Sequence, residues 1–143
     1  MKIRNQYLNF AWLVSLVATV GSLFFSEAMK LPPCKLCWLQ RIFMYPLVYL
    51  LAVAIIRKDL RIKLFTIPLA VLGLLIAVYH NLLYYKIIPE SLKPCTEGVS
   101  CTSRQIEWLG FITIPFLSLV AFTLVVGFLS FYKEEPVMKG HKL

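Results

Sequence analysis

A four-helix transmembrane bundle is the fold that this sequence predicts, and three observations lead to it. Hydrophobic residues make up 59% of the 143 residues and charged residues only 15%, against about 45–50% and about 25% in a soluble domain. The mean hydropathy is +0.76. The apolar residues fall into four stretches close to the ~20 residues that cross a bilayer as a helix. We therefore expect a single all-α integral membrane domain over residues 1–143.

The four stretches are separated by short polar connections. The first carries no charge, and it is too long for a signal peptide and lacks a small-x-small cleavage site, so we expect it to be retained as a helix. The second contains a single charged residue, Arg41, near its start, and the third carries His80 toward its end. The expected helices are residues 8–25, 38–56, 64–88 and 108–132.

The basic residues of the connections predict the orientation, because cytoplasmic flanks are enriched in Lys and Arg. One side collects nine basic residues and the other six, and the densest group lies in residues 57–63. We therefore expect both termini in the cytoplasm, and segments 26–37 and 89–107 on the other side of the membrane. The formal net charge of +8 is explained by these membrane flanks, so we expect lipid contact and no nucleic-acid binding.

All four cysteines lie in the two outward segments, as the pairs Cys34–Cys37 and Cys95–Cys101. The side of the membrane outside the cytoplasm is oxidising, and paired cysteines form disulfides there. The Cys-x-x-Cys spacing is typical of redox pairs in which one thiol has a lowered pKa. We expect Cys37 at the start of the second helix, where peptide dipoles stabilise a thiolate, and Cys34 to be the more exposed cysteine. Arg41 follows Cys37 by one helical turn on the same face.

Three interpretations of these cysteines are open on the residues alone. Two inert disulfides could staple short loops, although the small ring of a Cys-x-x-Cys pair gains little from loop entropy. Four thiolates could bind zinc, but the oxidising side and the lack of a histidine next to either pair lead us to expect no metal. A redox pair needs an electron acceptor. Because the sequence has no haem-attachment motif and no Gly-rich nucleotide loop, elimination leaves a lipid-soluble quinone.

The string Pro-Cys-Lys-Leu-Cys-Trp-Leu-Gln-Arg at residues 33–41 resembles the DsbB family, the quinone-coupled thiol oxidoreductases. The four-helix layout and the run Cys-Thr-Ser-Arg-Gln-Ile-Glu-Trp-Leu-Gly at residues 101–110 extend the resemblance over essentially the whole chain. Only five residues separate Cys95 from Cys101, which is similar to the BdbC-type members of Gram-positive bacteria. Many other members have a much longer segment there.

The resemblance implies a route for electrons. A reduced DsbA-like thioredoxin-fold protein would attack Cys95, the freed Cys101 would act on Cys34, and Cys37 would become the thiolate beside a membrane quinone. The quinone would be menaquinone or ubiquinone. The residues that the resemblance implies at the quinone are Arg41 and His80.

Two other classes of protein fit parts of the sequence. A quinone reductase of the vitamin K epoxide reductase type shares a four-helix bundle and a Cys-x-x-Cys motif, but it usually carries the motif after its loop pair, which is the reverse of the order here. A disulfide-stapled membrane scaffold or assembly subunit would not be an enzyme at all. The substitution Cys37→Ser separates the scaffold from the enzyme, since an enzyme would lose activity while folded and a scaffold would lose stability.

Overall fold

Four long helices fill most of the computed structural model, which describes residues 2–30, 32–57, 60–88, 107–108 and 112–132. All four are long and apolar enough to cross a membrane, and the predicted four-helix transmembrane fold is confirmed. The elements in order are α1 (Lys2–Glu27), α2 (Lys35–Arg57), the 3₁₀ turn η1 (Leu60–Ile62), α3 (Lys63–Tyr84), β1 (Glu107–Trp108), β2 (Ile112–Thr113) and α4 (Ile114–Phe131).

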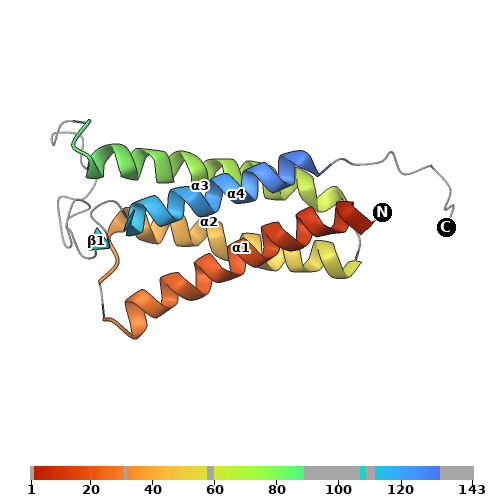
Figure 1. Ribbon diagram of the computed structural model, residues 1–143, viewed down its shortest axis with the longest axis horizontal. Helices are drawn as coiled ribbons and strands as arrows, with labels where there is room; N and C mark the ends of the chain where they lie inside the picture. The colour runs from red at the N-terminus through yellow and green to blue at the C-terminus, as the bar shows by residue number, and fades with distance from the viewer. Residues whose placement is uncertain (1, 31, 58–59, 89–106, 109–111, 133–143) are drawn as a thin grey trace, which may run out of the picture.

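Each helix packs against two others, because α1 and α3 both contact α2 and α4. Figure 1 shows the beginning of α1, the end of α4 and the connection from α2 to α3 together at one end of the bundle. The end of α1, the beginning of α2, the end of α3 and the beginning of α4 lie at the opposite end. This second end is called the thiol end below, because it carries Cys34 and Cys37.

The third helix ends at Tyr84, four residues before the predicted end at residue 88. Lys86 has a left-handed backbone with a φ of 57°, and an α-helix cannot continue through that conformation. The backbone N–H of Lys86 donates to the carbonyl of Leu83 at 3.1 Å, and that of Ile87 donates to Leu82 at 3.0 Å. These two bonds satisfy the last carbonyls of α3 in the pattern of a Schellman cap.

The fourth helix begins at Ile114, six residues after the predicted start at residue 108. The extended backbone of Thr113 precedes it, and the Thr113 hydroxyl accepts the N–H of Phe116 at 3.3 Å. This is an N-cap, and Pro115 in the first turn reinforces it because that position needs no N–H donor. Just before the cap, β1 and β2 pair antiparallel, so Trp108, Ile112 and Thr113, which were predicted to be helical, lie in a short strand pair.

A row of small residues lets α3 approach α4 closely. Ala70, Gly73 and Ala77 are buried on α3, and their spacing puts them on one face of the helix. Gly73 lies against the ring of Phe122 on α4, which is 1% exposed. Small residues at such contacts are typical of membrane helices, where close packing replaces the hydrophobic effect between helices.

We expect Gly73→Ala to destabilise the bundle. An added Cβ would overlap the Phe122 ring, and overpacking of this kind costs about 1–3 kcal/mol. Gly127→Ala on α4 is the matched control, because a Cβ there meets nothing within 4 Å. Thermal unfolding of both variants in detergent checks the prediction, and equal midpoints for the two variants would contradict it.

Candidate active site

Cys34 sits immediately before α2 and caps it. The backbone N–H of Cys37 donates to the Cys34 sulfur at 3.4 Å, and the N–H of Trp38 donates to the Cys34 carbonyl at 3.0 Å. The helix therefore begins at Lys35, three residues before the predicted start at residue 38. The positive end of the peptide dipoles consequently lies at Cys34, whereas the sequence analysis assigned it to Cys37.

The two sulfur atoms of this pair lie 2.9 Å apart, and both cysteines are thiols in the structure. Cys34 is buried, with 7% of its surface exposed, and Cys37 is partly exposed. The expectation that Cys34 is the more exposed cysteine is therefore wrong. The reason is packing, since Cys34 forms a small apolar cluster with Leu36 and with Leu83 of α3.

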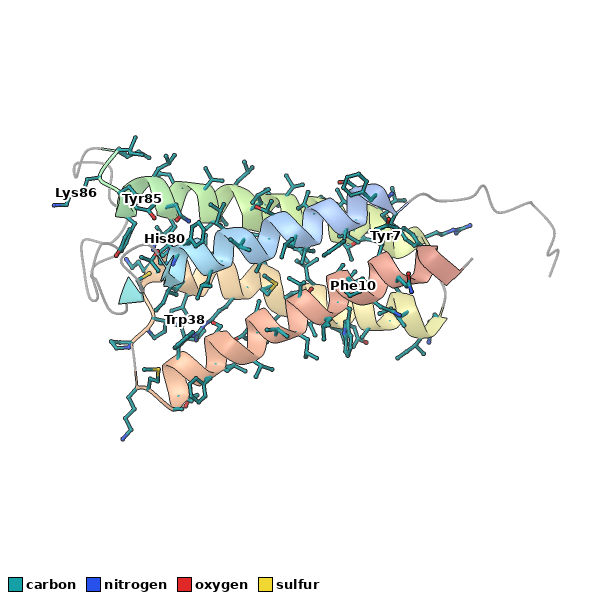
Figure 2. The ribbon with its side chains drawn as sticks, in the orientation of Figure 1. Tyr7, Phe10, Trp38, His80, Tyr85 and Lys86 are labelled. Carbon is teal, nitrogen blue, oxygen red and sulfur yellow. The ribbon has the colours of Figure 1, made fainter. Side chains whose placement is uncertain are left out.

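His80 of α3 lies at the thiol end, as does Trp38 of α2, while Tyr7 and Phe10 mark the other end of the bundle (Figure 2). The Nε2 atom of His80 is 3.8 Å from the Cys34 sulfur. Its Nδ1 atom is 3.3 Å from Nε2 of Gln40, and both side chains are buried. The structure thus brings His80 to the thiol pair through Cys34. Gln40 lies within the string at residues 33–41 that carries the family resemblance, but no role was predicted for it.

A cavity of about 520 Å³ adjoins the other side of the thiol pair. Cys37 lines this cavity, whereas the described residues around it include neither Cys34 nor His80. Most of the lining is apolar and comes from α1, α2 and α4. The polar and sulfur-bearing lining residues are Thr19, Ser22, Ser26, Cys37, Gln40, Arg41, Met44, Tyr45 and Ser118.

Arg41 lines the same cavity as Cys37, as their spacing predicts. Its Nε donates to the Ser22 hydroxyl and one terminal nitrogen donates to the Ser22 carbonyl, both at 2.8 Å. Its guanidinium also lies 5.6 Å from the centre of the Trp38 ring. Ser22 of α1 was missed by the sequence analysis, because a single serine in an apolar helix carries no signal. A guanidinium has five N–H donors, so these bonds leave others for a cavity ligand.

Several contacts at the Cys34 sulfur together lower the pKa of its thiol. The largest contribution is the hydrogen bond with the Cys37 side chain, burial opposes it, and the contact with His80 lowers the pKa further. These contacts favour the thiolate form of Cys34, which is the form that takes part in disulfide exchange.

We expect reduced Cys34 to ionise well below the usual cysteine pKa of about 8.5. The shift lowers the pKa in the folded state, so it stabilises the reduced fold above the unfolded-state pKa. That contribution is lost as the pH falls through the folded-state pKa. The ultraviolet absorbance of the thiolate, measured as the difference between the reduced protein and its Cys34→Ser variant, gives the midpoint. A midpoint at or above the usual value would contradict the prediction.

The ligand atoms of Cys34, Cys37 and His80 all lie within 4.8 Å of one another, which is close enough to consider a thiophilic metal ion. Two thiolates on a tetrahedral zinc stand ~3.8 Å apart, given Zn–S bonds of about 2.3 Å. The 2.9 Å between the two sulfur atoms here is shorter, so the pair would have to open to hold an ion. The observed spacing suits a pair that forms a disulfide between its two sulfurs better than it suits metal binding.

The other predicted site residues, Cys95 and Cys101, lie outside the described residues. The roles assigned to them stay predictions. The described part of the candidate site comprises Cys34, Cys37 and Arg41, with His80 next to the Cys34 sulfur rather than at the cavity, and with the additional side chains of Gln40 and Ser22. The functional roles of these residues also stay predictions.

A membrane bundle with a close thiol pair between a buried histidine and an apolar cavity has the arrangement expected of a membrane thiol–disulfide oxidoreductase. The sequence model described as "Disulfide bond formation protein DsbB" matches residues 4–132. The chain is therefore a multi-pass membrane protein of the DsbB family.

Similar proteins carry related names. "Disulfide bond formation protein C" of Bacillus subtilis (strain 168) is 46% identical over 137 residues, which cover 94% of this chain and 98% of that protein. "Probable disulfide formation protein C 1" of Bacillus anthracis is 44% identical, with coverage of 85% and 88%. "Probable disulfide formation protein" of Metapseudomonas resinovorans is 41% identical, with coverage of 82% and 83%. No solved structure matched the chain.

Proposed function

We propose that this protein reoxidises an extracytoplasmic DsbA-like thioredoxin-fold protein and passes the electrons to a membrane quinone, which supports disulfide formation in secreted proteins. The observation that carries the proposal is the two-sided environment of the thiol pair. The Cys37 sulfur adjoins an apolar cavity that also holds the Arg41 guanidinium, while Cys34 lies 2.9 Å away on the side of His80.

The cavity fits a quinone in size and chemistry. Its volume of about 520 Å³ lies within the ~300–1,000 Å³ of small-molecule sites, which are mostly apolar with a few polar groups. Arg41 would hold a quinone oxygen with the N–H groups that Ser22 leaves unused, and Val14, Ala18 and Met44 offer apolar contact. A bound quinone, menaquinone or ubiquinone, would supply an acceptor for two electrons and two protons.

The cysteines move one disulfide in two exchanges. The partner's dithiol is oxidised when its thiolate attacks Cys95 and its second thiol resolves the mixed disulfide, which leaves Cys95 and Cys101 reduced. Cys101 then attacks Cys34, Cys37 leaves as a thiolate, and Cys95 resolves the bond to Cys101. Each exchange transfers two electrons, so the pair Cys34–Cys37 ends reduced with Cys37 at the cavity.

The orientation proposed for this route places the thiol end outside the cell membrane. The beginning of α1 and the end of α4 lie on the side of the bundle remote from the thiols, together with the α2–α3 connection. That connection carries the densest basic cluster, Arg57 to Lys63, and such clusters stay in the cytoplasm. Both termini would then be cytoplasmic, and the partner would meet the cysteines outside.

The experiment that tests the proposal is quinone reduction by the purified protein in lipid nanodiscs, with a reduced thioredoxin-fold protein as donor. We expect one quinone to be reduced for each disulfide formed in the donor. Donor alone and protein alone are the controls. No turnover with menaquinone or ubiquinone analogues, with all four cysteines stably oxidised, would favour the disulfide-stapled scaffold instead.

A further inference from the structure

Gln40 occupies a position between the cavity and His80. Its side chain is 6% exposed and lines the cavity on one side. On the other side its Nε2 atom lies 3.3 Å from Nδ1 of His80. His80 is 1% exposed, and its Nε2 atom is 3.8 Å from the Cys34 sulfur. A continuous chain of three side chains thus runs from the cavity wall to Cys34.

The direction of the Gln40 contact determines which histidine nitrogen carries the proton. In the arrangement of the structure the amide nitrogen of Gln40 faces Nδ1 of His80, and an amide nitrogen can only donate. Nδ1 then accepts, and a neutral imidazole would carry its proton on Nε2, the atom that lies 3.8 Å from the Cys34 sulfur. A neutral imidazole held in this way donates to a thiolate, and no second charge has to be buried to do so.

Burial makes loss of the contact between Gln40 and His80 costly in free energy. Gln40 and His80 are both more than nine-tenths buried, and a buried polar group without a partner costs about 1–3 kcal/mol. Leu36 and Leu83 pack against Cys34 as apolar neighbours. Among the described residues, the titratable side chains that adjoin Cys34 or its cluster are Cys37 on α2 and His80 and Tyr79 on α3.

We propose that Gln40 is a positioning residue that holds His80 with its Nε2–H directed at the Cys34 sulfur. The inference rests on the proposed function only in treating Cys34 as a redox sulfur. It gives His80 a place different from the quinone contact that the family resemblance implies, because His80 adjoins Cys34 and is not among the described residues that line the cavity.

The test is a titration of the reduced thiol pair, which needs neither partner nor quinone. All proteins carry Cys95→Ser and Cys101→Ser, so that the ultraviolet thiolate absorbance comes from Cys34 and Cys37 alone. The midpoint is measured in this background, in Gln40→Leu, in His80→Ala and in the double variant. Gln6→Leu is the matched control, since it removes the same amide from an exposed site in α1 at the other end of the bundle.

We expect His80→Ala to raise the midpoint by roughly one pH unit, since a donor to the thiolate is lost. Gln40→Leu should raise it by part of that amount and should add nothing once His80 is absent, because a residue that acts through another is non-additive with it. An unchanged midpoint in Gln40→Leu, or the same shift with and without His80, would overturn the inference. Gln40→Met, with an unbranched side chain, replaces Gln40→Leu if the latter fails to fold. If the midpoints of the single and double variants follow this pattern but the protein reduces no quinone, the inference about Gln40 holds and the proposed function is wrong.

Discussion

Replacing Cys37 with serine is expected to abolish quinone reduction and to leave the bundle folded. Cys37 is the cysteine of the pair that lines the cavity. A serine hydroxyl in its place neither forms a disulfide nor ionises near neutral pH. Loss of a covalent catalytic group typically lowers turnover by more than ~10³-fold. Because serine is close to cysteine in size and Cys37 is partly exposed, little packing is lost.

Three measurements on Cys37→Ser decide the outcome. Quinone reduction with a reduced thioredoxin-fold donor should vanish, and the thermal unfolding midpoint in detergent should stay near that of the reduced parent protein. A mixed disulfide between the donor and the loop pair should still form when Cys95 and Cys101 start as a disulfide, since both cysteines are present. A large drop in the unfolding midpoint or in membrane accumulation would instead indicate that the pair is a structural staple.

Arg41→Ala is expected to raise the apparent KM for quinone by ~10–100-fold, because a charge-assisted hydrogen bond is worth about 1.5–3 kcal/mol. Disulfide exchange with the donor should be unaffected, since the described hydrogen bonds of Arg41 run to Ser22 and not to the sulfurs. Arg41→Lys keeps the charge but not the planar fork that bonds Ser22 and a ligand together, so we expect an intermediate effect.

Steady-state kinetics over a range of quinone concentrations, with the donor saturating, checks this prediction. Arg57→Ala is the matched control, since it removes an exposed guanidinium from the last residue of the same helix, at the end remote from the thiols. Unchanged quinone kinetics in Arg41→Ala would remove Arg41 from the site.

The number and type of the transmembrane elements could be predicted from the sequence, because a span needs about 20 apolar residues and each stretch has them. The helix ends could not be predicted as well, since they depend on caps rather than on hydropathy. The hydroxyl of Thr113 caps the first turn of α4, and Lys86, with its left-handed backbone, follows the end of α3. The start of α2 at Lys35 matters most for the site, since it puts the positive end of the helix dipole at Cys34 rather than at Cys37, where it was predicted.

The candidate site was predictable where its members are close in the sequence. Cys37 and Arg41 are one helical turn apart, and the structure puts both at one cavity. Contacts between helices were not predictable, because periodicity within one helix does not reveal which residue of another helix it faces. The pairing of Arg41 with Ser22, 19 positions away, and of His80 with Gln40 and Cys34 required the packed bundle.

The cavity lies where the protein meets the hydrocarbon. Leu13, Val17, Leu117 and Leu124 line it, and each is also 43–62% exposed on α1 or α4. A molecule entering by this flank arrives by lateral diffusion in the bilayer, so its effective concentration is its mole fraction in lipid. Adding inert lipid at constant protein and quinone should therefore slow turnover by surface dilution, whereas changing the aqueous volume should not. Affinities for this cavity are therefore best expressed as the mole fraction of ligand in the lipid rather than as its molar concentration in the whole sample.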